Sequence, residues 1–459
     1  MGEVWTGMLV KGKKAVVIGA GRTGIAAAKV LKGLGARVTV CDIKREYMLE
    51  EAIRQLKAIP VDVVAGGYPE ITPENTDFLV MSPGVPMNIS PVLKAKEYGI
   101  SLWSEIELAA SMFDAPIIAV TGTNGKTTTT SLLGRMFADG GIPTIVAGNI
   151  GVPLIGEIDK ITPDHVVVVE VSSFQLEAIH NFRPRVGIVL NITPDHLDRH
   201  HTMEEYKQAK QAIFCNQGKG DFSILNYDDE LVKSMASGTS GEVIFFSLRH
   251  TLEKGAYLSG EDLYFSYKGK KTFICSRSDL FLKGDHNLEN ILASCCAALL
   301  MGLDPGSVAQ TLRTFKGVKH RLQFVDEING VKYVNDSKGT NPDASIKAIS
   351  AYSEPIILIA GGKNKGSDFS EFADVIRRRV KEVIVLGEAA PEIMQALESV
   401  GYHKFSQVSS IEQAVARAAR IAVPGDIVLL SPACASWDMF NNYEERGELY
   451  ISQVAALRR

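Results

Sequence analysis

The sequence has 459 residues, which is too long for one hydrophobic core and predicts about three domains. Hydrophobic residues make up 46% and charged residues 22%, and the net charge of −4 provides no basic surface, so we expect no nucleic-acid partner. No apolar run reaches the ~18 residues of a membrane-spanning helix, so we expect no membrane partner.

The N-terminus lacks the charged and apolar layout of a secretion signal. Gly2 and Thr6 match the short myristoylation pattern, but no other feature points to a membrane. The six cysteines include no C-x-x-C pair and favour a reducing, cytoplasmic setting. Cys295 and Cys296 lie in the apolar run ILASCCAALLMGL, which predicts a buried helix with small core thiols.

Apolar runs alternate with helical patterns along the whole chain, which predicts an α/β fold with largely parallel sheets. We place domain boundaries near 104 and 317, giving domains at 1–104, 105–317 and 318–459. Residues 242–275 are expected to include a hairpin. The other predicted strands lie in KAVVIG, RVTVCD, TDFLVMSP, APIIAVTG, HVVVVEVSS, VGIVLNITP, IILIAGG, EVIVLG and DIVLLSPA.

The first candidate site follows the strand AVVIG, where Gly19, Gly21 and Gly24 form a G-x-G-x-x-G turn before a helix. Such a turn brings phosphates close to a helix N-terminus. Asp42 ends the next strand and is placed to accept a hydrogen bond from a ribose or a base. The motif predicts a nucleotide and by itself suggests NAD. The alternative is a glycine turn that serves only helix–sheet packing.

The second candidate site is GTNGKT, which follows the strand PIIAV and precedes a helix. It is shorter than the usual phosphate loop, because Val120 stands where the first glycine is expected. Gly122 and Gly125 still permit exposed N–H groups, Lys126 provides a cation and Thr127 provides a hydroxyl for Mg²⁺. We interpret it as an ATP loop, with a coincidental G-K-T as the alternative.

Acidic and histidine residues gather at the ends of the next two strands. Glu170 ends VVVVE and is a candidate direct or outer-shell Mg²⁺ ligand, since a lone buried carboxylate would be costly. NITPDHLDRHH places Asp195, His196, Asp198, His200 and His201 at another strand end. A zinc site is possible, although no second ligand cluster completes one. We favour His196 as a site residue and expect His200 and His201 to be solvated.

These motifs together resemble the Mur ligase family over nearly the whole chain. The similar blocks are GTNGKT, GNIG, EVSSFQLE, NITPDHLDRH, GDHNLEN, HRLQ, NDSKGTNPDA and SPACASWDMFNNYEERG. NDSKGTNPDA is the most discriminating, because sister ligases differ there. It looks most like the branch that adds D-glutamate to UDP-N-acetylmuramoyl-L-alanine in peptidoglycan synthesis.

The resemblance implies a Rossmann-like domain that binds UDP rather than NAD, a P-loop ATPase-like central domain and a Rossmann-like C-terminal domain. The resemblance implies that the UDP-substrate is bound by Arg22, Thr23, Asp42, Ile43, Ser82, Pro83, Gly84, Asn149, Ser172 and Phe174. It implies that ATP is bound by Gly122, Thr123, Asn124, Gly125, Lys126, Thr127, Thr128, Asn287, Asn290, Arg321, Asp336 and Lys338. Ile43 departs from the small polar residue that is usual in the family.

For the metals, the resemblance implies two Mg²⁺ ions near Thr127, Glu170, His196 and Lys210, with Lys210 carbamylated. The catalytic residues are then Lys126, Glu170, His196 and Lys210. Without the family, Lys210 would be interpreted as a solvated helical lysine. It implies that D-glutamate is bound by Thr340, Lys365, Ser436, Trp437 and Tyr443. Trp437 and Tyr443 depart from the residues that are expected at these positions. The alternative interpretation of Lys365 is a solvated loop lysine.

The implied chemistry is phosphorylation of the alanyl carboxylate by ATP, followed by attack of the D-glutamate amine on the acyl phosphate. We expect a cytoplasmic monomer with small-molecule substrates. A folylpolyglutamate synthetase-like ligase is the alternative, but the glycine turn at residue 19 is not expected in one. An NAD enzyme or a nucleotide sensor would have no need for Glu170, His196 and Lys210 together.

Overall fold

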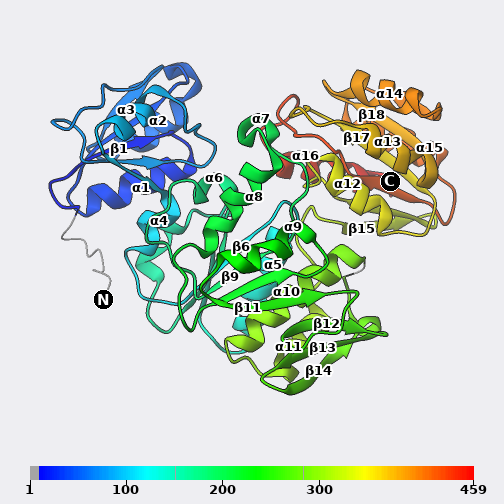
Figure 1. Cartoon of the computed structure of the whole chain (residues 1–459). Helices are drawn as coiled ribbons and strands as arrows, with labels where there is room; N and C mark the ends of the chain where they lie inside the picture. Colours follow the sequence, from blue (N-terminus) through cyan, green and yellow to red (C-terminus); the bar gives the residue numbers. More distant parts are fainter. Residues whose placement is uncertain (1–9, 150, 283, 459) are drawn as a thin grey trace. The chain divides into compact units, whose positions relative to one another are not determined.

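The structure is a computed structural model that describes residues 10–149, 151–282 and 284–458, without the side chains of Leu197 and Asp198. The myristoylation pattern at Gly2 and Thr6 lies outside these residues, as does Ile150 of the GNIG block. The chain forms three sheets, each with its own helices, which confirms a three-domain α/β fold (Figure 1).

By its internal packing the chain divides into two compact units. The first comprises Met1–Ile192, Glu204–Asp279 and Glu289–Arg313, and the second comprises Thr193–Met203, Leu280–Leu288 and Thr314–Arg459. The first two sheets belong to the first unit and the third sheet belongs to the second.

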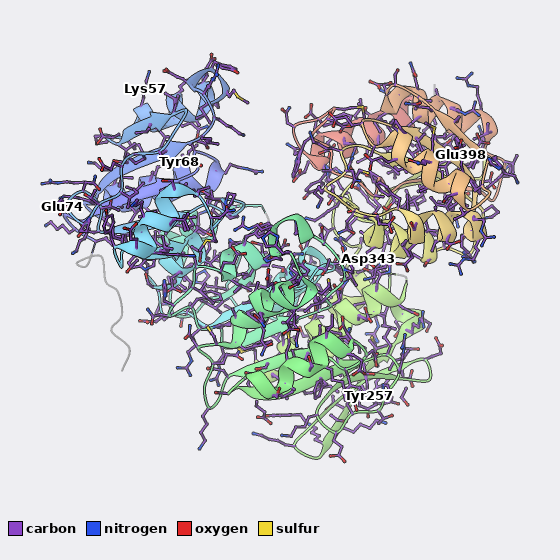
Figure 2. The ribbon with its side chains drawn as sticks, turned by 45° about the horizontal axis from the view of Figure 1, so that its top comes forward. Lys57, Tyr68, Glu74, Tyr257, Asp343 and Glu398 are labelled. Atoms are coloured by element: carbon purple, nitrogen blue, oxygen red, sulfur yellow. The ribbon has the colours of Figure 1, made fainter. Side chains whose placement is uncertain are left out.

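The first sheet has five parallel strands in the order β3-β2-β1-β4-β5. Its strands are β1 (Lys14–Ile18), β2 (Arg37–Asp42), β3 (Asp62–Ala65), β4 (Phe78–Met81) and β5 (Ser101–Ser104), and its helices are α1 (Arg22–Gly33), α2 (Glu50–Lys57) and α3 (Ser90–Glu97). Lys57, Tyr68 and Glu74, labelled in Figure 2, belong to this domain. Since parallel strands end at one edge, the glycine turn after β1 meets the ends of β2 and β4.

The second sheet has nine strands in the order β14-β13-β12-β11-β10-β9-β6-β8-β7. Its strands are β6 (Ile117–Thr121), β7 (Thr144–Gly148), β8 (Val166–Glu170), β9 (Val186–Val189), β10 (Phe222–Asn226), β11 (Glu242–Ser247), β12 (Gly255–Ser259), β13 (Asp262–Tyr267) and β14 (Lys270–Ser276). The expected hairpin is present as the antiparallel strands β12, β13 and β14, whereas β11 is parallel to its neighbours.

The α-helices between residues 105 and 314 include one long apolar helix. They are α4 (Glu105–Ala110), α5 (Lys126–Asp139), α6 (Ser173–Leu176), α7 (Leu197–His200), α8 (Met203–Gln211), α9 (Glu230–Lys233), α10 (Asp285–Leu300) and α11 (Pro305–Thr314). The run ILASCCAALLMGL forms most of α10, and Cys295 and Cys296 are fully buried in it, which confirms the prediction. None of the described helices is long and apolar enough to cross a bilayer.

The third sheet has the order β15-β16-β20-β17-β18-β19, and only β15 is antiparallel to its neighbour. Its strands are β15 (Gln323–Ile328), β16 (Val331–Asn335), β17 (Ile356–Gly361), β18 (Val380–Leu386), β19 (Phe405–Gln407) and β20 (Ile427–Leu430). Its helices are α12 (Pro342–Ser350), α13 (Ser370–Arg379), α14 (Ala390–Ser399), α15 (Ile411–Ile421) and α16 (Tyr443–Ala456).

Both faces of the third sheet are covered, as expected for parallel strands that are apolar throughout. Alternate residues of β17 pack into two separate cores: Leu358 packs with α12, α13 and α14, and Ile359 packs with α15 and α16. Asp343 and Glu398, labelled in Figure 2, lie on α12 and α14. The strands β16, β20 and β17 are adjacent, so the loops that leave their carboxyl ends are neighbours.

Candidate active site

The loop between β6 and α5, residues 122–125, leaves the nine-stranded sheet at its carboxyl edge. Gly122 has a φ of 147° and Gly125 a φ of 86°, both in the region that favours glycine. A Cβ on Gly125 would lie 2.1 Å from Oδ1 of Asn290, so glycine is also needed there for the close approach of α10. The short loop therefore has the two glycines that it needs, and Val120 is a buried strand residue.

Asn191, which follows β9, holds this loop in place. Its Oδ1 accepts from the backbone N–H of Asn124 at 2.9 Å, and its Nδ2 donates to the Asn124 carbonyl at 3.1 Å. Its own carbonyl accepts from the N–H of Thr123 at 2.9 Å. Asn191 was not among the predicted site residues; its one sequence signal is its position at the head of the NITPDH block.

Lys126 begins α5 and folds back over the loop. Its Nζ donates to the carbonyls of Gly122 at 2.8 Å and Thr123 at 2.7 Å. Among the residues that the structure describes, the buried hydroxyls of Thr121, Thr128 and Thr129 have no hydrogen-bond partner. Leaving such groups unpaired is costly. Phosphate oxygens at this helix N-terminus would provide acceptors, so the loop fits the triphosphate of ATP.

Glu170, at the end of β8, lies beside this loop and is buried. Its Oε2 accepts from Thr127 Oγ1 at 2.8 Å, and its Oε1 accepts from Asn149 Nδ2 at 3.1 Å. A hydroxyl and one carboxylate fit Mg²⁺, which usually takes few protein ligands together with substrate phosphates. The described residues contain no group of three or more His, Cys, Asp or Glu that could hold a metal by themselves.

Lys210 lies on α8 with only 1% of its surface exposed, so its interpretation as a solvated lysine is wrong. Its Nζ donates to the Gly122 carbonyl at 3.0 Å and lies 4.4 Å from the ring centroid of Tyr206. The same Gly122 oxygen accepts from Lys126, so two ammonium groups share one carbonyl. Sequence spacing could not predict this, because the packing of α8 against the loop decides it.

In the first domain the glycine turn is closed by polar contacts from β2 and β4. A Cβ on Gly24 would lie 1.8 Å from the Gly19 carbonyl, so this position requires glycine. Asp42 Oδ2 accepts from the N–H of Ala20 at 2.9 Å, and Ser82 Oγ donates to the Gly19 carbonyl at 3.3 Å. The remaining members of the predicted UDP set differ in exposure: Arg22, Ile43 and Gly84 are exposed, and Thr23 and Pro83 are half-buried.

The carboxyl ends of the adjacent strands β7 and β8 carry the other predicted UDP-substrate residues. Ser172 caps α6 through a capping box with Gln175, in which Ser172 Oγ accepts from the Gln175 N–H at 3.3 Å. Phe174 lies in the first turn of the same helix. Asn149 is bound to Glu170 through both its backbone and its side chain.

On α10, Asn287 and Asn290 are both buried near the helix N-terminus. In the second unit, Asp336 follows β16 and accepts from the Leu322 N–H at 3.2 Å and from Ser431 Oγ at 2.8 Å. Burial raises the pKa of Asp336 to about 6, although the nearby Arg321 opposes this rise. Among the described residues the buried Nε of Arg321 has no hydrogen-bond partner.

His196 belongs to the second unit, where it has a φ of 54°. Its Nε2 lies 3.7 Å from Asp195 Oδ2, and that oxygen also accepts from Asn341 Nδ2 at 3.0 Å. Lys365 Nζ lies 3.5 Å from Asp195 Oδ1, with 16% of its side chain exposed, so Lys365 is not a solvated loop lysine. The participation of His196 in a metal site with Glu170 stays a prediction.

The histidines that follow His196 differ from each other. His200 has only 4% of its surface exposed, so the expectation that it is solvated is wrong, whereas His201 is exposed as predicted. The cause is α7: its single helical turn directs His200 inward, and His201, with a φ of 59°, ends the turn. Asp198 lies in the same turn, and its side chain is outside the described residues.

The predicted D-glutamate residues lie on the neighbouring loops of the third sheet. Thr340 follows β16, Lys365 follows β17 and Ser436 follows β20. Tyr443 begins α16, and its hydroxyl accepts from Lys338 Nζ at 3.1 Å. Ser436 is buried, whereas Trp437 is 66% exposed. The strand order therefore brings the loops that carry Thr340, Lys365, Ser436 and Trp437 to one edge, although the roles of these residues stay predictions.

Comparison with known proteins agrees with this arrangement. Family models match residues 13–104 (Mur ligase MurD-like, N-terminal domain), 120–298 (Mur ligase middle domain) and 320–434 (Mur ligase, glutamate ligase domain). A UDP-N-acetylmuramoylalanine--D-glutamate ligase of Pelotomaculum thermopropionicum is 51% identical, with 97% of this chain and 98% of that protein covered. The chain belongs to the Mur ligase family. A ligase of the same name from Clostridioides difficile is 46% identical to this Mur ligase, over 98% of this chain and 100% of that protein.

Solved structures of other Mur ligases share the fold. The UDP-N-acetylmuramate-alanine ligase of Thermotoga maritima has a TM-score of 0.60 and 18% identity, covering 97% of this chain and 99% of that chain. The MurF ligase of the same organism, solved with ADP, also has a TM-score of 0.60 with 18% identity, covering 92% and 96%.

Glu105 is a residue of this Mur ligase that sequence reasoning missed. It begins α4, is fully buried, and accepts from the Ile155 N–H at 2.6 Å and from Gln175 Nε2 at 3.4 Å. Through Gln175 it supports the cap at Ser172, and through Ile155 it holds the segment that follows Asn149. Burial raises the pKa of Glu105 to about 7.

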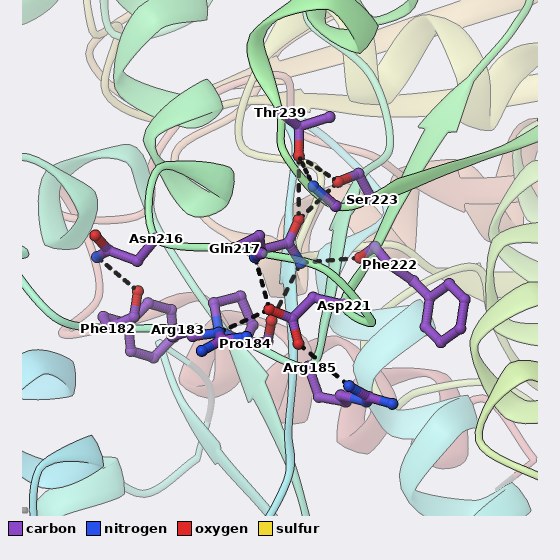
Figure 3. Close-up of polar contacts among 12 residues, drawn as sticks. Phe182, Arg183, Pro184, Arg185, Asn216, Gln217, Asp221, Phe222, Ser223 and Thr239 are labelled. Carbon is purple, nitrogen blue, oxygen red and sulfur yellow. Dashed lines mark hydrogen bonds and ion pairs between the residues drawn. The ribbon is translucent and has the colours of Figure 1, made fainter. Parts of the chain in front are cut away.

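The opposite, amino edge of the nine-stranded sheet carries a separate polar network (Figure 3). Asp221 accepts from Arg183 Nε at 2.7 Å, from Arg185 Nη1 at 3.4 Å and from the Gly218 N–H at 2.9 Å. Gln217 donates to the carbonyls of Pro184 and Phe222 and accepts from Ser223 Oγ at 2.6 Å. A cavity of about 790 Å³ lies at this edge beside Arg183, Arg185 and Asp221, and none of the predicted site residues lines it.

Proposed function

We propose that this Mur ligase joins D-glutamate to UDP-N-acetylmuramoyl-L-alanine in the cytoplasm, with conversion of ATP to ADP and phosphate. The observation that carries the proposal is 51% identity over 97% of the chain to a ligase named for this reaction. The convergence of Lys126, Thr127 and Glu170 at one loop supports it, because joining a carboxylate to an amine requires activation by a phosphoryl group.

In this proposal the loop at 122–125 and Lys126 hold the phosphates of ATP. Thr127 and Glu170 hold Mg²⁺, which neutralises the phosphate charge. Asn287, Asn290, Arg321, Asp336 and Lys338 serve the rest of the nucleotide, together with Thr123, Asn124 and Thr128. The γ-phosphoryl group passes to the alanyl carboxylate, and the resulting acyl phosphate is attacked by the amine of D-glutamate.

We propose that Lys210 acts as a carbamate beside a second Mg²⁺, together with His196. The support is electrostatic: the ammonium groups of Lys210 and Lys126 both contact the Gly122 carbonyl, at 3.0 and 2.8 Å. Two cations that contact the same oxygen repel each other. Carbamylation would turn the cation on Lys210 into an anion, removing that repulsion and adding a ligand for Mg²⁺.

The UDP-substrate is assigned to the first domain and D-glutamate to the third. The glycine turn, Asp42 and Ser82 form the UDP end, with Arg22, Thr23, Ile43, Pro83 and Gly84 at its rim, and Asn149, Ser172 and Phe174 serve the muramoyl end. Thr340, Lys365, Ser436, Trp437 and Tyr443 bind D-glutamate. We propose domain limits of 1–104, 105–317 and 318–459, and a monomer as the active species.

The test measures the release of phosphate from ATP. The assay contains Mg²⁺, UDP-N-acetylmuramoyl-L-alanine and either D- or L-glutamate. We expect release and a new UDP-linked product only when the nucleotide substrate and D-glutamate are both present. Turnover with L-glutamate and a folate in place of the UDP-substrate would instead identify a folylpolyglutamate synthetase-like ligase.

A further inference from the structure

Arg446 is a buried cation that none of the assigned roles uses. It lies in the first turn of α16, and only 2% of its surface is exposed. No carboxylate of the described residues forms an ion pair with it, although burial lowers the pKa of its guanidinium only to about 10, so it stays charged. A cation near a helix N-terminus is also disfavoured by the helix dipole.

The guanidinium is bound by loop oxygens instead. Nε donates to Ser337 Oγ at 3.0 Å and Nη2 donates to the Ser337 carbonyl at 2.8 Å. Both Nη atoms donate to the Cys434 carbonyl at 3.3 Å, and Nη1 makes longer contacts of 3.5 Å with the Gly361 and Ala435 carbonyls. The planar fork of arginine suits such a set of acceptors, whereas a lysine ammonium cannot reach them all.

These oxygens come from the loops that leave three adjacent strands. Ser337 belongs to the loop after β16, Gly361 ends β17, and Cys434 belongs to the loop after β20. The same three loops carry Thr340, Lys365 and Ser436, as assigned to D-glutamate above. Arg446 therefore joins the loops after β16 and β20 to the carboxyl end of β17.

Two further contacts extend this arrangement to α16. Ser337 Oγ, which accepts from Arg446, donates to the Tyr443 carbonyl at 2.8 Å. At Gly362, where φ is 130°, a Cβ would lie 2.2 Å from the Ala435 carbonyl and 3.1 Å from Arg446 Nη1. The β17 loop can approach the guanidinium this closely only because glycine stands there.

We propose that Arg446 is a positioning residue for the amino acid substrate: it fixes the loops after β16, β17 and β20 in the relative arrangement that binds D-glutamate. The proposal rests on the proposed function, because D-glutamate is the substrate of that site. An apolar side chain of similar volume would fill the same space without the cost of burying a cation. The reason for arginine is then the set of loop carbonyls that it holds.

The experiment compares Arg446→Met, Arg446→Lys and the surface control Arg377→Met, whose side chain is half-exposed and pairs with Asp374. Wild-type turnover with D-glutamate is measured first, and its absence would contradict the proposed function rather than this inference. For each variant, KM for D-glutamate is then measured and compared with the wild-type value. The Kd values of the UDP-substrate and ADP are compared in the same way, by calorimetry without turnover.

We expect Arg446→Met to raise KM for D-glutamate by about tenfold or more, which corresponds to ~1.4 kcal/mol. Both Kd values should stay within about twofold of wild type. Arg446→Lys should have a KM for D-glutamate between those of wild type and Arg446→Met. Guanidinium chloride at millimolar concentration should restore part of the activity of Arg446→Met. If Arg446→Met does not fold, Ser337→Ala removes one acceptor and should raise the same KM alone. An unchanged KM for D-glutamate, or an equal loss for all three ligands, would overturn the inference.

Discussion

The two edges of the nine-stranded sheet differ in how completely the fold satisfies their buried polar groups. At the amino edge, Asp221 and Gln217 are joined to Arg183, Arg185, Ser223 and backbone groups within one network (Figure 3). At the carboxyl edge, the buried hydroxyls of Thr121, Thr128 and Thr129 have no partner among the described residues. Polar groups that satisfy one another stabilise the fold, whereas groups that the fold leaves unsatisfied are available to a ligand. The comparison therefore predicts which substitutions affect activity and which affect stability.

The largest effect on activity is expected for Lys126→Ala. Removal of the cation from the loop should lower kcat by at least about 100-fold, the scale of losing one preorganised charge-stabilising donor. The melting temperature and the Kd of the UDP-substrate should be close to wild type, because the glycine turn lies in another domain. Lys254→Ala, which removes a lysine paired with Glu242 at the surface, is the control. Loss of UDP-substrate binding by folded Lys126→Ala would contradict this division of roles.

The next effect concerns the amino acid site. Lys365→Ala should weaken the use of D-glutamate by about ten- to 150-fold, since a hydrogen bond to a charged group contributes about 1.5–3 kcal/mol. The matched control is Lys363→Ala in the same loop, where Lys363 is half-exposed and pairs with Glu388. Steady-state kinetics with each substrate varied in turn decide the result. Equal KM values for D-glutamate in the two variants would remove Lys365 from the site.

The carbamate that we propose on Lys210 would make activity depend on carbon dioxide. Since a carbamate forms from CO₂ and a neutral amine, turnover should fall in CO₂-depleted buffer and recover with bicarbonate. Lys210→Ala should be insensitive to bicarbonate. A crystal structure with both substrates bound should show a planar three-atom cap beyond Nζ, and a bare ammonium there would refute the carbamate.

At the amino edge, Asp221→Asn should have the opposite signature to Lys126→Ala. Loss of the charge-assisted bonds to Arg183 and Arg185 should lower the free energy of unfolding by about 1–3 kcal/mol. The kinetic constants at a permissive temperature should stay within about twofold of wild type. Thermal denaturation and initial rates measure the two effects separately, and a large fall in kcat without loss of stability would place part of the chemistry at this edge.

The smallest effect is a pH dependence from Glu105. Its folded pKa of about 7 lies above the ordinary glutamate value of 4.5, so the native state binds more protons than the unfolded state between these pH values. The stability contributed by the neutral carboxyl is therefore present below about pH 4.5 and is lost as pH rises to about 7. Glu105→Gln should gain in melting temperature relative to wild type over this window. The control Glu97→Gln changes a surface carboxylate. Its melting temperature should differ from that of wild type by the same amount across this pH window.

Local patterns predicted the parts of the site that depend on local geometry. The glycines at 19, 24, 122 and 125 were found because a strand, a tight turn and a helix follow one another in the sequence, and the structure shows the positive φ values or close contacts that require them at these positions. Glu170 was found because a charged residue at the end of an apolar strand needs a partner, and its partners are Thr127 and Asn149.

Other features depend on contacts between distant segments, which spacing does not encode. Lys210 is buried because α8 packs on the phosphate loop, 88 residues away in the sequence. His200 is buried at the end of the single helical turn α7, a position that the polar run NITPDHLDRHH does not distinguish from the exposed His201. Asn191, Glu105 and Arg446 bind backbone groups of other segments, so the sequence assigned them no role, although Asn191 and Arg446 lie within blocks that resemble the family.

The most direct test of the account follows oxygen from substrate to phosphate. UDP-N-acetylmuramoyl-L-alanine labelled with oxygen-18 in its alanyl carboxylate is incubated with the enzyme, ATP, Mg²⁺ and D-glutamate, and the released phosphate is analysed by mass spectrometry. If the carboxylate oxygen attacks the γ-phosphorus and the amine then displaces phosphate, each phosphate released carries one label. Unlabelled phosphate, with the labelled amide product formed at the same rate, would contradict the acyl phosphate and the role assigned to the carboxyl edge.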